Sequence, residues 1–209
     1  MLLTATAEEK AILKGRVVDA EGKAVKGAAV LVYDSPEVRR RADFESARTE
    51  GDGKFRMVLL PGKYWTVARF KKVEGFGPLR PGDKHSGEPR EVELASGAEL
   101  ETDLKIEDIK AVARNKPRED YFKIKGRILD EKGLPVSKVY AIANRKETFS
   151  GLPDYLSAWT DEEGHYTLYL PRGKYYAGAA AAFPPGGNYF MNKVLVIDSD
   201  RSDVNISGK

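Results

Sequence analysis

Two histidines are the residues of this chain best suited to act as a base or a metal ligand. His85 lies in the polar stretch RPGDKHSGEPRE and His165 in the turn DEEGH. Neither has a second histidine at metal-ligand spacing, and neither implies a partner serine. The chain has no cysteine, which excludes disulfides and thiolate chemistry. We therefore expect two exposed histidines, no catalytic residue, no metal and no cofactor, with an enzyme as a remote alternative.

Carboxylates in two turns could offer oxygen ligands to a divalent cation. Glu50 and Asp52 belong to TEGDGK, and Asp161, Glu162 and Glu163 to TDEEGH. A calcium loop of the EF-hand type needs about 12 residues with donors at alternating positions, and these turns are shorter. Asp and Gly also shape tight turns. Turn formation is the main interpretation, and a weak cation site is the alternative.

Three arginines at 39–41 could meet a phosphate or a carboxylate surface. The same loop contains Asp34, Glu37 and Asp43, which offset the positive charge. We therefore expect a solvated loop whose charges pair internally.

Large apolar residues in two loops rich in glycine and proline are the candidates for a binding surface. Loops on a rigid scaffold often carry binding residues, and exposed apolar residues mark interfaces. The alternative is that these side chains fold back and cap the open end of a β-sandwich. The loops are KKVEGFGPLRPGDKHSGEPRE (71–91) and FPPGGNYFMNK (183–193). The candidate interaction residues are Phe76, Leu79, Phe183, Tyr189, Phe190 and Met191.

The elements that carry these loops occur twice. TEGDGKFRMVLLPGKY (49–64) returns as TDEEGHYTLYLPRGKY (160–175). A single constant offset in residue number, the one that takes Thr49 to Thr160, relates the two copies, and we call residues related by it counterparts. From 15 to 65 this register gives 14 identities in 51 positions. A constant offset means that the intervening loops keep their length, so the pattern indicates a tandem duplication of one domain.

Each copy has the pattern of short β-strands. Leu13, Gly15 and Val17 alternate with more polar residues, a period of two, and turn residues recur every 8 to 12 positions. Only 106–116 has a helical pattern, and we interpret it as part of a linker. The sequence therefore predicts an all-β protein of two tandem β-sandwiches. The predicted parts are an N-terminal segment at 1–10, a first sandwich at 11–107, a linker at 108–120 and a second sandwich at 121–209.

The repeated residues resemble a known family. The pattern G-x-V-x-D-x-x-G-x-x-V, followed by T-D-x-x-G-x-Y-x-L-x-L-P-x-G-x-Y, is similar to the carboxypeptidase regulatory-like domain. This resemblance implies the transthyretin-like (prealbumin-like) fold, a Greek-key β-sandwich. It also implies a non-catalytic accessory, stabilising or adhesive module of exported and surface proteins. The matching residues are Gly15, Val17, Asp19, Gly22, Val25, Thr49, Gly53, Phe55, Leu59, Pro61, Gly62 and Tyr64, and in the second copy Gly126, Ile128, Asp130, Gly133, Val136, Thr160, Gly164, Tyr166, Leu168, Leu170, Pro171, Gly173 and Tyr175.

The beginning of the chain and its charge bear on location. Ala5-Thr6-Ala7, after Leu2 and Leu3, has the form of a signal-peptidase site, so we expect an exported protein; a frayed N-terminus is the alternative. The 35 basic and 32 acidic residues give a net charge of +3, which does not indicate a nucleic-acid partner. No run reaches the roughly 18 apolar residues of a membrane span.

These observations favour a non-catalytic structural or assembly protein that is secreted, periplasmic or on the cell surface. It would contact other proteins or itself, as a homo-oligomer or a filament, through loop aromatics and sheet edges. The alternative is a glycan- or peptide-binding module that uses the loops 71–90 and 183–193.

Overall fold

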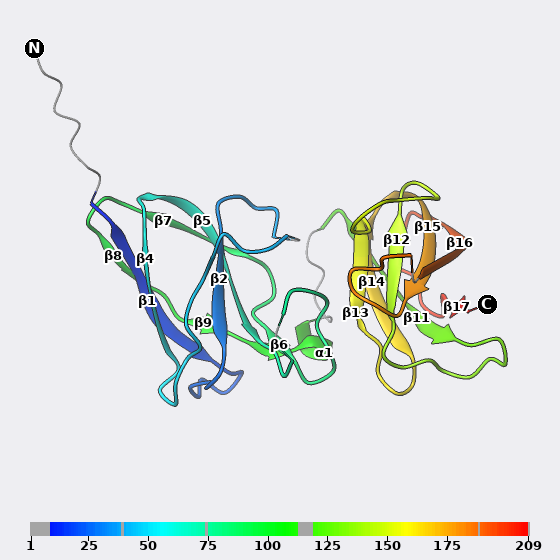
Figure 1. The fold of residues 1–209 in the computed structure, drawn as a ribbon, viewed down its shortest axis with the longest axis horizontal. Coiled ribbons are helices and arrows are strands. Elements are labelled where there is room, and N and C mark those ends of the chain that lie inside the picture. The colour runs from blue at the N-terminus through cyan, green and yellow to red at the C-terminus, as the bar shows by residue number, and fades with distance from the viewer. Residues whose placement is uncertain (1–8, 39, 74, 113–118, 188, 209) are drawn as a thin grey trace, which may run out of the picture. The chain divides into compact units, whose positions relative to one another are not determined.

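The computed structural model shows a protein whose regular secondary structure is almost entirely β-strand (Figure 1). The one helix of the described part is the single turn α1 (Ile109–Val112), inside the stretch with the helical pattern. The predicted all-β class is confirmed. The described residues are 9–38, 40–73, 75–112, 119–187 and 189–208. Most of the predicted N-terminal segment and the middle of the predicted linker lie outside them.

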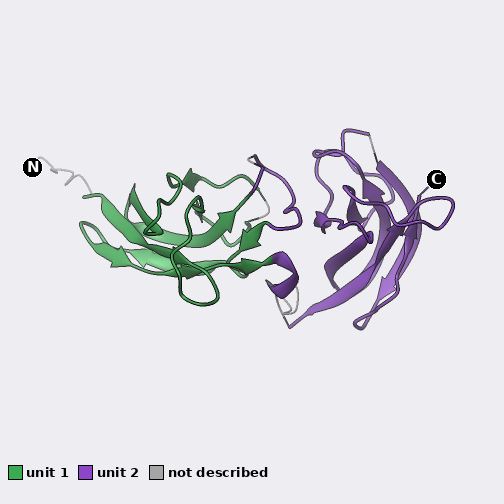
Figure 2. Ribbon diagram, turned by 90° about the horizontal axis from the view of Figure 1, so that it is seen from below, with its two compact units in different colours: residues 1–71, 83–108 green, residues 72–82, 109–209 purple. Residues whose placement is uncertain are grey.

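The chain forms two compact units (Figure 2). The first contains 1–71 and 83–108, and the second contains 72–82 and 109–209. Segment 72–82 is therefore part of the second unit, although the sequence assigned it to the first sandwich. The domain limits remain a prediction, because a compact unit is not necessarily a part that folds alone.

The first unit consists of two sheets that enclose one core. One sheet has the order β4-β1-β8, with β9 also paired to β1; the other has the order β10-β6-β5-β2-β3, with β7 paired to β5. The strands are β1 (Ala11–Val18), β2 (Ala29–Tyr33), β3 (Phe44–Glu45), β4 (Lys54–Leu59), β5 (Gly62–Phe70), β6 (Lys84–His85), β7 (Arg90–Leu94), β8 (Glu99–Glu101), β9 (Leu104–Lys105) and β10 (Glu107–Asp108).

The second unit also has two sheets, with the orders β14-β11-β17 and β13-β12-β15-β16. Its strands are β11 (Tyr121–Leu129), β12 (Tyr140–Asn144), β13 (Tyr155–Trp159), β14 (His165–Pro171), β15 (Gly173–Ala180), β16 (Tyr189–Ile197) and β17 (Ile206–Ser207).

Alternation along each strand creates the cores. In β4 the side chains of Phe55, Met57 and Leu59 are buried and the residues between them are exposed. In β14 the buried side chains are Tyr166, Leu168 and Leu170, as the period of two predicts. Each such side chain contributes about 1.5–3 kcal/mol when it leaves water.

The same strand pairing occurs in both units at the offset of the sequence repeat. Leu13 pairs with Met57 across β1 and β4, and their counterparts Ile124 and Leu168 pair across β11 and β14. A parallel strand lies on the other side of each first strand: β9 beside Val17 and β17 beside Ile128. Counterpart positions in these strands can therefore be compared directly.

A shared glycine permits this double pairing. A Cβ at Gly126 would lie 2.1 Å from the backbone oxygen of Val204, and one at Gly15 would lie 1.9 Å from that of Thr102. Both distances are far shorter than a van der Waals contact. Only glycine allows the last segment of each unit to approach its first strand so closely.

The variant Gly126→Ala is expected to lower the free energy of unfolding of the second unit by about 3 kcal/mol, because the backbone must move apart to admit the methyl group. Gly51→Ala is the control, since a Cβ there meets nothing within 4 Å. Urea denaturation followed by fluorescence measures both. Equal stability of the two variants would show that the close approach is not required.

Candidate functional site

The outward face of the sheet β13-β12-β15-β16 is apolar. Outward-facing positions of an antiparallel sheet are commonly polar. Here Tyr140 and Ile142 of β12 lie on the side away from the main core, and both are fully buried. Ala180 of β15 pairs with Tyr140 and belongs to the same buried cluster.

Half-buried side chains from several strands and loops pack around these three residues. We call the whole group the outer cluster. Its ring centroids lie 5.0 Å apart for Tyr140 and Trp159, and 4.7 Å apart for Phe149 and Tyr189. These apolar groups cover the part of the sheet's outward side around Tyr140. The packed residues are Phe149, Leu156, Trp159, Phe183, Tyr189 and Met191.

Segment 72–82 adds to this side of the second unit. The backbone N–H of Trp159, in the edge strand β13, donates a hydrogen bond of 2.8 Å to the Leu79 carbonyl. The guanidinium of Arg80 lies 5.3 Å from the Trp159 ring centroid. The Phe76 ring meets that of Phe183 edge to face at 5.5 Å and is still 39% exposed.

The structure places the six sequence-predicted residues in three environments. Phe183, Tyr189 and Met191 belong to the outer cluster, and Phe76 packs on its rim. Phe190 faces the opposite way and packs against the main core of the unit. Leu79 contributes its backbone. Phe183, Tyr189 and Met191 thus cover the outward side of a sheet, and both the capping of an open end and contact with a partner remain predictions.

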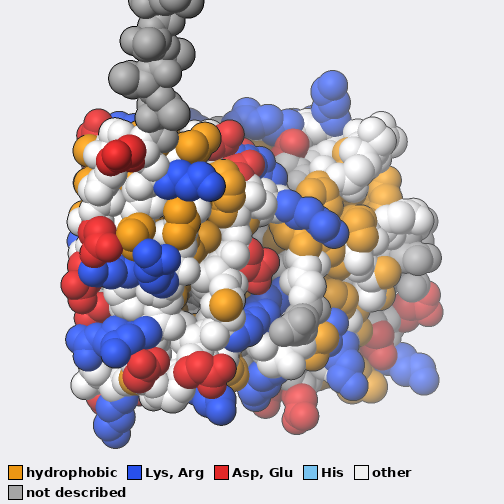
Figure 3. Space-filling view, turned by 60° about the vertical axis from the view of Figure 1, so that its left-hand side comes forward, with side chains coloured by type: hydrophobic (Ala, Val, Ile, Leu, Met, Phe, Trp, Pro, Cys, Tyr) orange, Lys and Arg blue, Asp and Glu red, His pale blue; other side chains and the backbone are white. Residues whose placement is uncertain are grey.

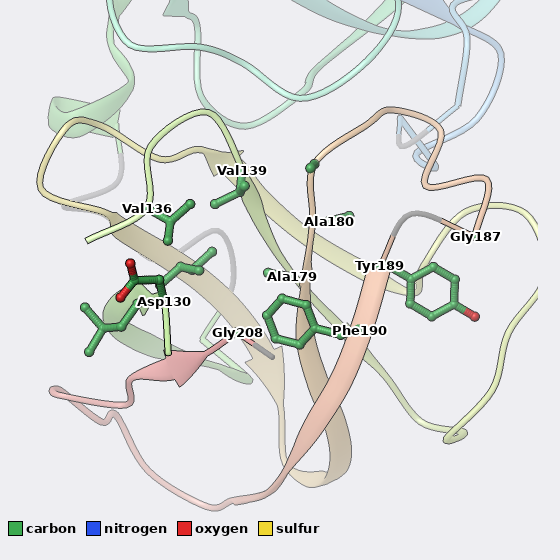
Figure 4. Close-up of a pocket in the computed structure, with 12 residues that line it drawn as sticks. Asp130, Val136, Val139, Ala179, Ala180, Gly187, Tyr189, Phe190 and Gly208 are labelled. Carbon is green, nitrogen blue, oxygen red and sulfur yellow. The ribbon is translucent and has the colours of Figure 1, made fainter. Parts of the chain in front are cut away.

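A cavity of about 400 Å³ opens at one end of the second unit, between its two sheets (Figure 4). Phe190, Val136 and Val139 form part of its wall, and Asp130 is the only charged residue among the described residues that line it. These described residues are Ile128, Leu129, Asp130, Val136, Val139, Ala179, Ala180, Ala181, Gly187, Tyr189, Phe190 and Gly208.

Two exposed valines on β16 were missed by the sequence analysis. Val194 is 55% exposed and Val196 is 63% exposed. They pair with Tyr176 and Lys174 on the outward side of the sheet. The signal was available in VLVI (194–197), where the period of two buries Leu195 and Ile197 and exposes the valines between them.

His85 is not the exposed loop residue that the sequence analysis expected. It lies in the short strand β6, which pairs with β5 and β10, and its Nδ1 accepts a hydrogen bond of 2.8 Å from the Gly87 N–H. Burial and, secondarily, the positive charge of Arg69 lower the pKa of His85 to about 3. The polar neighbours of His85 gave no sign of this strand.

The neutral form of His85 makes the first unit sensitive to acid. Its pKa in the folded chain is below the unfolded value of about 6.5, so its contribution is complete above pH 6.5 and declines as the pH falls toward 3. Between pH 7 and pH 4.5 the free energy of unfolding should fall by roughly 2 kcal/mol more in the wild type than in His85→Gln. Urea denaturation at both pH values measures this difference. An equal loss in the two proteins would contradict it.

His165 is exposed, as expected, and lies close to two carboxylates. One ligand atom from each of Asp161, Glu163 and His165 falls within 4.8 Å of the other two. Asp161 already forms an ion pair of 3.0 Å with Lys110 and accepts a hydrogen bond of 2.9 Å from the His165 N–H. The contacts of Asp161 fit the turn interpretation.

The arginine loop pairs internally, as expected, in its described part. Arg40 forms ion pairs with Asp34 and with Asp43, the latter at 2.7 Å. The hydrogen bond from Arg40 is the main reason that the pKa of Asp43 is lowered to about 2. Figure 3 shows acidic and basic side chains interspersed over the visible face, in agreement with the mixed charge of the sequence.

The serines shared by the two repeats are also engaged structurally. Ser157 Oγ accepts a hydrogen bond of 2.9 Å from the Ala141 N–H and donates one of 2.6 Å to the Ala158 carbonyl. Ser46 makes the same contacts with Val30 and Ala47.

Comparisons with known proteins place the chain in no family. No family model matches it, and no curated protein matches its sequence. The resemblance to the carboxypeptidase regulatory-like domain, with its Greek-key strand order, therefore remains a prediction. No helix of the described part is long and apolar enough to cross a membrane.

Several solved structures are similar at low levels. The Bacillus anthracis TIE protein is 17% identical, with a TM-score of 0.31, over 96% of this chain and 33% of its own. A streptococcal ancillary pilin is 12% identical, with a TM-score of 0.33, over 98% of this chain and 62% of its own. A DUF3823 family protein from Parabacteroides merdae is 12% identical, with a TM-score of 0.32, over 92% of this chain and 100% of its own. The chain thus spans about a third of the first protein and under two thirds of the second, and TM-scores of this size carry no argument about activity or partners.

Proposed function

We propose that the chain is a non-catalytic, exported assembly protein of the cell surface or periplasm, and that it associates with a second copy of itself through β16 and the outward side of the second unit's sheet. The observation that carries this proposal is the exposure of Val194 and Val196, at 55% and 63%, on a strand at the edge of its sheet.

The corresponding strand of the first unit is charged where β16 is apolar. Glu93 pairs with Lys63, and Val196 pairs with Lys174, the counterpart of Lys63. Glu91 also forms an ion pair of 2.7 Å with Lys63. Charges on an edge strand discourage pairing with other chains, so their replacement by valine favours it. The matched positions are Glu91 with Val194 and Glu93 with Val196.

The geometry of β16 suits a second copy. Antiparallel pairing of one β16 with another is self-complementary and brings the same valines together across a two-fold axis. Val194 and Val196 would then meet across the contact as β-branched pairs, which contribute to sheet stability. The Arg201 side chain reaches the Val196 carbonyl at 3.5 Å and must shift for such pairing.

The packing of the loop aromatics favours a protein contact over a glycan contact. A glycan platform needs open aromatic faces, whereas Phe183 and Tyr189 are half-buried in the outer cluster. Ser157 and His85 hold structural hydrogen bonds, which supports a non-catalytic role.

The double variant Val194→Glu Val196→Glu tests the proposal, because it gives β16 the charges of β7. Light scattering across a concentration series is expected to show the wild-type mass rising above 23.1 kDa while the double variant stays monomeric. Val58→Glu is the control, since Val58 is also an exposed strand valine, 50% accessible, but lies in the first unit.

The reverse change, Glu91→Val with Glu93→Val, should increase association. A wild type that stays monomeric at every concentration would contradict the proposal. So would a double variant that associates as the wild type does.

A further inference from the structure

The two units differ just after the strand that pairs parallel with the first strand, which is β9 in the first unit and β17 in the second. The Ile106 N–H donates a hydrogen bond of 2.8 Å to the Val18 carbonyl. In the second unit the Gly208 N–H donates one of 2.6 Å to the carbonyl of Leu129, the counterpart of Val18. Ile106 and Gly208 therefore occupy the same place, and one has a branched aliphatic side chain where the other has none.

Ile106 closes the core of the first unit. It is 1% exposed and belongs to the buried cluster between the two sheets. Three members of that cluster have counterparts that line the cavity of the second unit. The pairs are Val17 and Ile128, Ala28 and Val139, and Ala68 and Ala179.

A second position beside the cavity also has a smaller side chain than its counterpart in the first unit. Phe70 packs against the core of the first unit, and its ring would lie 3.4 Å from a Cβ at Gly27. The counterpart of Phe70 is Ala181, which lines the cavity. The cavity thus lies where the first unit places an isoleucine and a phenylalanine.

In the first unit β10 pairs antiparallel with β6, Glu107 opposite His85. His85 pairs with Arg69, and Tyr189 pairs with Ala180, the counterpart of Arg69. The start of β16 at Tyr189 is therefore the edge that corresponds to β6, and among the described residues no strand pairs with it beyond β15.

We propose that the open end of the second unit binds an extended peptide segment of a partner protein. The segment inserts a branched aliphatic side chain into the cavity and pairs with β16 near Tyr189, as Ile106 and β10 do within the first unit. Such binding is β-strand addition, with the backbone supplying hydrogen bonds and the pocket supplying selectivity. This inference goes beyond the proposed self-association and does not depend on it.

The probe is a fluorescent peptide, DLKIED, that copies residues 103–108. Fluorescence anisotropy with the full chain is expected to show saturable binding. The control peptide has alanine in place of the isoleucine and should bind about ten-fold more weakly or worse, since it loses a buried aliphatic group.

Gly208→Ile is expected to weaken binding of the probe by about ten-fold or more, because the protein then fills its own cavity. The new side chain has room: a Cβ at Gly208 meets nothing closer than the Leu129 oxygen at 3.5 Å. Ala181→Phe fills the cavity from the other side and should act in the same direction. Gly51→Ile, a matched change in an open turn of the first unit, should leave binding unchanged.

Thermal unfolding shows whether Gly208→Ile and Ala181→Phe are folded. Binding of the probe to the wild type is then compared with binding to a variant that is folded. No saturable binding to the wild type would overturn the inference. Equal binding by a folded cavity-filling variant, or by the alanine peptide, would also overturn it. Val194 and Val196 are absent from the cavity lining. Light scattering can therefore contradict self-association without contradicting peptide binding, and anisotropy can do the reverse.

Discussion

The first strand of each unit is paired on both sides, and this constraint organises everything else. β1 pairs antiparallel with β4 and parallel with β9, and β11 pairs antiparallel with β14 and parallel with β17. The double pairing requires two backbones to approach within the space that a Cβ would occupy at Gly15 or Gly126. With that approach in place, alternation along the strands directs one set of side chains into the core.

The same constraint fixes the position at which the units diverge. β9 and β17 each run to the end of their sandwich, so the residue that follows each of these strands decides whether that end is closed. An isoleucine closes the first unit, and a glycine leaves about 400 Å³ open in the second. On the opposite sheet, the edge strand carries glutamates in one unit and valines in the other. The shared residues thus support the fold, and the unshared ones give the second unit its cavity and its apolar edge strand.

The sequence predicts the fold well because its signals are local. The period of two in β4 and β14, the Asp and Gly turns and the constant offset each depend on neighbouring residues or on the repeat. It also identified Phe183, Tyr189 and Met191 as residues with a special environment, although it left open whether they cap or bind. His85 was misjudged because its environment depends on pairing with β5 and β10, strands that its sequence neighbours do not reveal. The cavity could not be predicted from the sequence, because Ile106 and Gly208 are matched by their hydrogen bonds and not by the constant offset of the repeat.

Segment 72–82 has a consequence for how the chain can be divided. It leaves β5 and returns to β6, both strands of the first unit, yet its contacts with Trp159 and Phe183 belong to the second. No single cut of the polypeptide can therefore yield two complete units. A fragment that begins after residue 108 would lack the Leu79 carbonyl that accepts a hydrogen bond from Trp159, and a fragment that ends there would keep Phe76 without its aromatic neighbour. The boundary between the two units therefore does not coincide with one position in the sequence.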